Sequence, residues 1–297
     1  MYHRILPQND PRYSIEEPGM IVEPETFRMH LKVLKNEFTM ISLTEWVKRK
    51  KNNQPLPLKA CTITFDDGWL DNYEFALPIL QQEQIPATLF AVSDMVGTSQ
   101  TFWPNRIQEL LKQPESNLMT IPWLEELVGE NPVNKELSAS VIYSLKHRSD
   151  TELIKLIDQA ERKLGILSNY SPALVDLNQL REMSDSGLME IGSHTCQHIR
   201  LVEGLGNKTY HHEIYNSKKR LEEILDKPVN LFCYPNGDHC DKAVSEVSKH
   251  YDAAVTTQKG INREKNCQLY TLSRFGVHQD ISYNERKLLS NLSGFRF

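Results

Sequence analysis

Short apolar runs alternate with longer amphipathic stretches along most of the chain. Runs rich in β-branched and aromatic residues, bounded by turn-forming residues, predict strands. These runs are Thr39–Leu43, Ala60–Phe65, Ala87–Val92, Met189–Gly192, Val229–Cys233 and Asp252–Val255. Between them, apolar residues recur every three or four positions, as they do on one face of a helix. The helices predicted in this way cover Pro24–Phe38, Asp71–Gln84, Thr209–Leu225 and Cys240–His250.

Strands that alternate with helices predict an α/β fold, because a parallel strand is reached through a helical crossover. We expect a distorted (β/α) barrel, with an open doubly wound sheet as the alternative. The strand rhythm lapses between about residues 98 and 172, where stretches such as Thr151–Leu164 have a helical pattern. We therefore predict a single domain over residues 1–297 that carries a helical insertion.

Composition narrows the classes of function. The 297 residues include 34 Lys and Arg against 39 Asp and Glu, a net charge of −5, which lacks the positive field of a nucleic-acid-binding protein. No stretch is long and apolar enough for a membrane span. The start at Met1 lacks the apolar segment of a signal peptide, so we expect a cytoplasmic protein as written, or an exported one if the start has been trimmed. Five unevenly spaced cysteines predict free thiols.

Two short motifs carry candidate chemistry. Asp66 and Asp67 directly follow a predicted strand, where the loops of α/β folds gather ligands. Neighbouring carboxylates can divide their work between a metal ion and proton transfer, although an Asp-Asp-Gly turn is also common as plain structure. His194 and His198 follow another strand, and on a helical turn their side chains would point to the same side. Two imidazoles and one carboxylate leave open positions on a metal ion, as catalysis requires.

Taken together, Thr64-Phe-Asp-Asp-Gly68 and His194-Thr-Cys-Gln-His198 resemble the first two motifs of the polysaccharide deacetylases, also called the NodB-homology group or carbohydrate esterase family 4. Tyr2-His3-Arg4 and Tyr234-Pro-Asn-Gly237 are most similar to the branch of the poly-N-acetylglucosamine deacetylases. The resemblance implies the distorted barrel. It also implies one divalent metal ion, zinc with cobalt or nickel as alternatives, held by Asp67, His194 and His198.

The resemblance assigns further roles to this chain. Asp66 would be the general base, and the backbone N–H of Tyr234 would stabilise the oxyanion. The third motif lacks the arginine that is common in the family, and Arg274 could supply that charge. The general acid has two candidates, His278 and His3.

Substrate contacts are expected from three residues, Trp69, His3 and Pro235, with the indole ring of Trp69 facing a sugar. His211 and His212 lie within a predicted helix and are interpreted as a solvated helix face. The predicted function is that of a metal-dependent hydrolase that removes N-acetyl groups from amino sugars of a polysaccharide or glycolipid. The alternatives are an O-acetyl esterase acting on a polysaccharide such as xylan, and a catalytically weak carbohydrate-binding member of the fold.

Overall fold

A computed structural model describes residues 1–129, 131–166, 172–263 and 267–293 of the chain. Two compact units can be distinguished. The first combines Met1–Thr98 with Leu174–Phe297, and the second is Ser99–Ala173. In the described part of the chain, no helix has the length and apolar character needed to cross a membrane.

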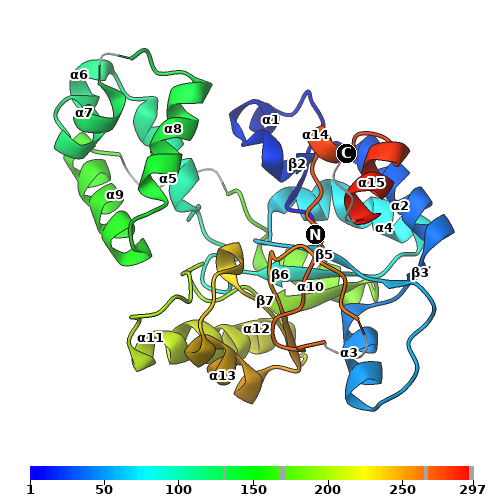
Figure 1. Cartoon of the computed structure of the whole chain (residues 1–297). Coiled ribbons are helices and arrows are strands. Elements are labelled where there is room, and N and C mark those ends of the chain that lie inside the picture. Colours follow the sequence, from blue (N-terminus) through cyan, green and yellow to red (C-terminus); the bar gives the residue numbers. More distant parts are fainter. Residues whose placement is uncertain (130, 167–171, 264–266, 294–297) are drawn as a thin grey trace. The chain divides into compact units, whose positions relative to one another are not determined.

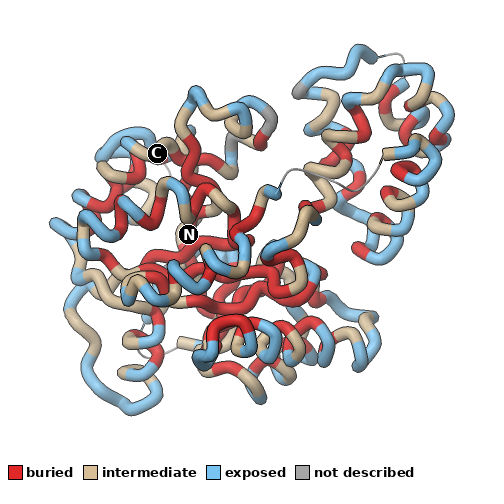
Figure 2. The backbone as a smooth tube through the Cα atoms, turned by 180° about the vertical axis from the view of Figure 1, so that it is seen from behind, coloured by how far each residue is buried: buried red, intermediate tan, exposed pale blue. Residues whose placement is uncertain are grey.

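A five-stranded parallel sheet forms the centre of the first unit (Figure 1). Its strands stand in chain order and are β5 Ile63–Phe65, β6 Ala87–Ala91, β7 Met189–Ser193, β8 Leu231–Cys233 and β9 Ala253–Val255. Nearly every strand residue is buried (Figure 2), as expected for a parallel sheet that is covered on both faces. The consecutive strand order follows from the helical crossovers that the sequence predicts.

Backbone hydrogen bonds extend this sheet beyond both of its edges. Tyr2 lies parallel to Phe65 at one edge, and Leu272 lies parallel to Val255 at the other. The chain just before Val277 is in turn bonded to Met1, since the N–H of Val277 donates to the Met1 carbonyl at 3.1 Å. The sheet is therefore curled into a half-barrel, which confirms the predicted distorted barrel and excludes the open doubly wound sheet.

Helices cover the outside of the curled sheet because each presents an apolar face to it. In α2, for example, Pro24–Glu37, the side chains of Phe27, Leu31 and Leu34 are buried. The other helices of this unit are α1 Pro11–Ile15, α3 Leu43–Lys51, α4 Leu77–Glu83, α10 Leu177–Asp185, α11 Asn207–His211, α12 Ser217–Leu225, α13 Asp241–His250, α14 Gln279–Ser282 and α15 Glu285–Ser293.

Some predicted elements differ in detail from the observed ones. The strand expected over Thr39–Leu43 is only β3 Thr39–Met40, which pairs with β4 Ala60–Cys61, and a second short pair joins β1 Arg4–Ile5 to β2 Ile21–Val22. The helix expected over Thr209–Leu225 is divided by a π-helical turn at His212–Asn216, between α11 and α12. A similar turn, Asn72–Ala76, precedes α4. Such turns often accompany functional sites.

In its described residues, the second unit, residues 99–173, is built from helices with a hydrophobic core of their own. They are α5 Trp103–Leu111, α6 Glu115–Leu118, α7 Pro122–Val128, α8 Lys135–Leu145 and α9 Asp150–Leu164. Local signals set the ends of α9: the Ser149 side chain caps its first turn, and Gly165 ends it in a left-handed conformation with φ 67°. The sequence predicts a helical insertion over about residues 98–172, and this compact unit covers residues 99–173.

Candidate active site

The motif residues all follow strands of the central sheet. Asp66 and Asp67 come directly after β5, His194 comes directly after β7, and Tyr234 comes directly after β8. Because the strands are parallel, their carboxyl ends lie at the same end of the half-barrel. Residues that are 128 positions apart in the sequence, such as Asp66 and His194, are therefore brought together.

Asp67, His194 and His198 form a group that could hold one metal ion. Oδ1 of Asp67 lies 3.4 Å from Nε2 of His194 and 3.5 Å from Nε2 of His198. Four ligands in a tetrahedron with bonds of about 2.0–2.1 Å lie about 3.3–3.4 Å from one another. The three donor atoms thus have both the chemistry and the spacing of a site for zinc or a similar divalent ion.

The segment between the two histidines is a turn, so the expectation of a helical turn is wrong. Thr195 and His198 have left-handed backbone conformations, with φ of 67° and 57°. This conformation is costly for a β-branched residue such as Thr195, and strained backbone of this kind is concentrated at functional sites. The buried Glu213 holds the turn, because its Oε2 accepts the N–H groups of Cys196 and Gln197, both at 3.0 Å.

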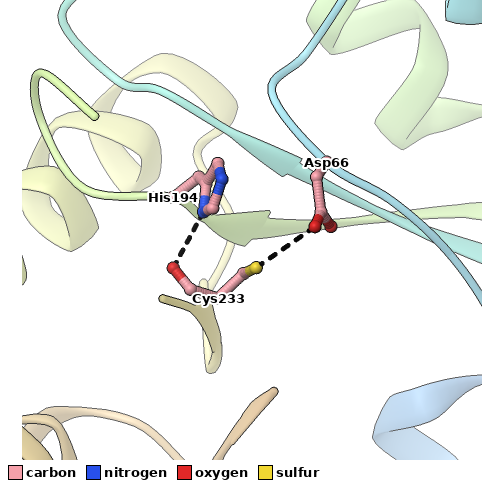
Figure 3. Close-up of side chains that lie close together, drawn as sticks. All are labelled: Asp66, His194 and Cys233. Carbon is pink, nitrogen blue, oxygen red and sulfur yellow. Dashed lines mark hydrogen bonds between the residues drawn. The ribbon is translucent and has the colours of Figure 1, made fainter. Parts of the chain in front are cut away.

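The tautomer of His194 follows from its hydrogen bond to the end of β8. Nδ1 of His194 lies 2.8 Å from the carbonyl oxygen of Cys233 (Figure 3), and a carbonyl can only accept. Nδ1 therefore carries a proton, and Nε2 is the ring nitrogen that lies on the side of Asp67. A backbone acceptor behind a histidine ligand is the usual way in which proteins orient it.

Two features fix the carboxylate of Asp67. Its backbone is left-handed, with φ 77°, and it is followed by Gly68 with φ 83°, a conformation that glycine adopts without strain. The indole N–H of Trp69 donates to Oδ2 at 2.8 Å, which leaves Oδ1 toward the histidines. Burial alone would raise the pKa of Asp67, but hydrogen bonds with His194 and His198 hold it well below its ordinary value.

Asp66 is paired with Arg274, 208 positions away in the sequence. Nη1 and Nη2 of the guanidinium group donate to Oδ1 and Oδ2 of Asp66, both at 2.7 Å. Both side chains are buried, and Arg274 is further held by Thr64 Oγ1 and the Thr256 carbonyl. Burial alone would raise the pKa of Asp66, but the adjacent guanidinium overcomes this and lowers the pKa to about 2. Asp66 is therefore ionised at neutral pH.

Sequence reasoning predicts only a free thiol for Cys233 and misses its place beside Asp66. Its buried thiol lies 3.5 Å from Oδ2 of Asp66, the contact drawn in Figure 3, and 3.2 Å from Nη2 of Arg274. Burial raises the pKa of this thiol, so it remains protonated at neutral pH. The position of Cys233 immediately before Tyr234, at the end of a strand, was the one available signal.

Trp69 does not offer a surface to a sugar in this structure. Its side chain is only 2% exposed, and the guanidinium group of Arg4 lies 4.1 Å from the centre of its ring. Arg4 is itself held by Asp71 at 2.8 Å and by Glu16 at 2.5 Å. This buried ionic group, which sequence reasoning also missed, packs behind the indole that orients Asp67.

Tyr234 lies directly after β8 and beside the end of β9. Its backbone N–H donates to the carbonyl of Val255 at 3.2 Å, as part of the β8–β9 ladder, and so is already engaged where it was expected to face an oxyanion. Its ring is fully buried. Pro235 begins the short helical turn Pro235–Gly237 at the same end of the strands and is also buried.

The two candidate general acids come from opposite ends of the chain. His3 follows Tyr2, the neighbour of Phe65, and its charge contributes to lowering the pKa of both Asp66 and Asp67. His278 follows the segment that is bonded to Met1. Its Nδ1 lies 3.5 Å from Oδ2 of Asp280, and within the described residues this buried nitrogen makes no hydrogen bond.

The chain is similar to known proteins over most of its length. The polysaccharide deacetylase family model matches residues 53–254. YxkH of Bacillus subtilis is 22% identical over 284 residues, which are 95% of this chain and 71% of that protein. The poly-beta-1,6-N-acetyl-D-glucosamine N-deacetylase of Escherichia coli K12 is 22% identical over 229 residues, 76% of this chain but only 29% of that enzyme.

Solved structures share the fold over nearly the whole chain. The Streptococcus pyogenes deacetylase PplD has a TM-score of 0.65 and 21% identity, covering 98% of this chain and 96% of PplD. IcaB from Ammonifex degensii has a TM-score of 0.62 and 18% identity, covering 98% of this chain and 94% of IcaB. Since the family model spans more than half of the residues, including both aspartates and both histidines of the site, the chain belongs to the polysaccharide deacetylase family.

Proposed function

We propose that this protein is a metal-dependent deacetylase that removes N-acetyl groups from amino sugars of a polysaccharide or glycolipid. The observation that carries the proposal is the spacing of Asp67, His194 and His198, with the ionised carboxylate of Asp66 beside them. The related Escherichia coli enzyme is named for poly-beta-1,6-N-acetyl-D-glucosamine, which supports an N-acetylated glycan as the substrate class.

The reaction consumes one water molecule: its oxygen bonds to the acetyl carbon, the C–N bond breaks, and acetate and a free amine leave. A divalent metal ion bound by Asp67, His194 and His198 would polarise the acetyl carbonyl and increase the acidity of water. Asp66 accepts the proton of the attacking water. Arg274 keeps the Asp66 carboxylate ionised and fixes its orientation through two parallel hydrogen bonds.

The amine cannot leave without a proton, which a general acid must donate. His3 and His278 are the proposed donors: His3 follows Tyr2, which pairs with the last residue of β5, and His278 follows Val277, whose N–H donates to the Met1 carbonyl. Pro235, which begins the turn after β8, is the proposed substrate contact. For Trp69 we propose a positioning role, through its hydrogen bond to Asp67.

Acetate release from N-acetylated glucosamine oligomers tests the proposal, with β-1,6- and β-1,4-linked oligomers and O-acetylated xylan assayed in parallel. We expect release from an N-acetylated oligomer that is abolished by a chelator and restored by Zn²⁺. Asp66→Asn should lower the rate by about 10²–10⁴-fold, the usual contribution of a general base. The matched control is Asp252→Asn, which alters an exposed carboxylate just before β9, at the opposite end of the strands.

The outcomes separate the alternatives. Release from xylan alone would replace the deacetylase by an O-acetyl esterase. Zinc binding without release from any of the three substrates would contradict the proposed activity and favour a carbohydrate-binding member of the fold. An Asp66→Asn variant as active as Asp252→Asn would remove Asp66 from the reaction.

A further inference from the structure

A second group of two histidines and one carboxylate lies on the outer helices, apart from the candidate active site. His211 is the last residue of α11, while Glu246 and His250 lie one turn apart on α13. The His211 side chain is 55% exposed, and the other two are about one-fifth exposed. The group is therefore open to ions in solution.

The donor atoms of this group have the same spacing as those of the candidate active site. Oε1 of Glu246 lies 3.4 Å from Nδ1 of His211 and 3.3 Å from Nε2 of His250. Both contacts are hydrogen bonds in this structure, and both are longer than the usual N–H···O separation of about 2.7–3.2 Å. The two distances agree with the edge of a zinc tetrahedron, about 3.3–3.4 Å, and with the 3.4 and 3.5 Å at Asp67.

Neighbouring side chains hold these donors in place. Lys249 donates to Oε2 of Glu246 at 2.6 Å, so that Oε1 is the oxygen directed at the histidines. The ring of Tyr215, from the π-helical turn after α11, stacks on His211 with centroids 4.9 Å apart and lies 5.0 Å from the ring of His250. A supported carboxylate and two oriented imidazoles are what a site formed before metal binding requires.

We propose that His211, Glu246 and His250 form a second site for a divalent metal ion of the zinc class, distinct from the candidate active site. Imidazole and carboxylate donors suit Zn²⁺ and its neighbours, whereas Ca²⁺ and Mg²⁺ prefer a shell of oxygen atoms. The protein supplies three ligands, and the exposed side of His211 leaves the remaining position to solvent. The bound ion would link α11 to α13.

Zinc stoichiometry of variants tests the site. Protein freed of metal by a chelator is dialysed against Zn²⁺, and bound zinc is measured by elemental analysis. We expect two equivalents in the wild type and one in the double variant His211→Ala/His250→Ala. Glu246→Gln, which keeps the size of the side chain, should also lose one equivalent. His147→Ala, which removes another exposed imidazole, should keep both.

A variant of the candidate active site separates this proposal from the proposed function. His194→Ala/His198→Ala should retain one equivalent, and that equivalent should be lost when His211 and His250 are also replaced. Substitution of Co²⁺ gives a second measurement, since each tetrahedral site contributes visible absorption and the double variant should lose one of two contributions. Circular dichroism establishes that each variant is folded.

The outcomes are decisive in both directions. A wild type that binds one equivalent, lost on replacing His194 and His198, would overturn the second site and leave the proposed function intact. A His211→Ala/His250→Ala protein that keeps two equivalents would also overturn it. Zinc that is lost only on replacing His211 and His250 would support the second site and contradict the metal centre of the proposed function.

Discussion

The pairing of Asp66 with Arg274 predicts a large loss of stability in Arg274→Gln. The substitution leaves the carboxylate of Asp66, which is 2% exposed, without its two hydrogen bonds of 2.7 Å. Glutamine keeps part of the length and polarity of arginine but has no charge. The protein is studied with a chelator present, so that only the chain contributes to the free energy of unfolding.

The expected magnitude can be worked from the pKa of Asp66. Arg274 holds it at about 2, and without the guanidinium group burial would place it above the ordinary 3.8. Returning the pKa from about 2 to 3.8 corresponds to about 2.5 kcal/mol at 1.36 kcal/mol per pKa unit, and burial adds to this. Removal of one partner from a buried ion pair typically costs about 3–5 kcal/mol. We expect a loss of about 3–5 kcal/mol at pH 7.

The sign of the pH dependence follows from the same pKa. In the wild type the folded pKa is lowered, so the stabilisation by the pair is present above about pH 4 and is lost as the pH falls toward 2. In Arg274→Gln the folded pKa lies above that of the unfolded chain, so the penalty is full at neutral pH and disappears on acidification. The difference in stability between the two proteins should therefore narrow as the pH falls from 7 to 4.

Urea denaturation of four proteins completes a double-mutant cycle: the wild type, Arg274→Gln, Asp66→Asn and the double variant. The loss of stability in the double variant should be smaller, by at least about 2 kcal/mol, than the sum of the losses in the two single variants. Arg12→Gln is the matched control, because Arg12 makes the same two-pronged contact with Asp10 but is 26% exposed. It should cost about 1 kcal/mol or less. Equal losses in Arg274→Gln and Arg12→Gln, or additive effects in the cycle, would refute the reasoning.

Three further predictions concern buried polar contacts. Burial lowers the pKa of His30 to about 4, so between pH 6.5 and 4 only the unfolded chain binds a proton at this residue. The free energy of unfolding of the wild type should therefore fall by about 3 kcal/mol as the pH is lowered from 6.5 to 4, and urea denaturation of His30→Gln should lack this fall. Glu213→Ala should weaken zinc binding at the candidate active site about 10–100-fold, measured by competition with a chelator, because the turn between the two histidines loses its acceptor. Trp69→Phe should weaken it about 10-fold by removing the N–H that holds Asp67, and unchanged competition curves would contradict both of these roles.

The sequence alone predicted the α/β half-barrel and the ligand group. The alternation of strands and helices is a local property, and parallel strands place the residues after β5 and β7 at the same end. The choice of Asp67, His194 and His198 as the ligand set came from the resemblance of the two motifs to those of the polysaccharide deacetylases. The helical insertion, about residues 98–172, was predicted from a lapse in strand pattern that is visible over many residues.

Only the tertiary structure decided how these groups are oriented and supported. The turn at Thr195, which replaced the expected helix, depends on the acceptor Glu213 from a distant helix. The path of the chain after β9 determines that Arg274 is the arginine that pairs with Asp66. The indole of Trp69 is held inside the protein by its contacts with Arg4 and Asp67. These orientations are set by burial and hydrogen bonding between segments that are distant in the sequence. Such contacts produce no periodic pattern of residues that sequence reasoning could detect.

His211, the last residue of α11, shows the same division between what the sequence predicts and what packing decides. In the sequence, His211 has the appearance of a solvated helix face, because its partners lie 35 and 39 positions further along the chain. Packing of α11 near α13 places it beside Glu246 and His250. Residue type and spacing determine which ligands a chain can offer. The packing of helices and strands decides whether these ligands come together, because the ligand atoms of a metal site must lie within a few ångströms of one another. Their separation in the sequence does not matter.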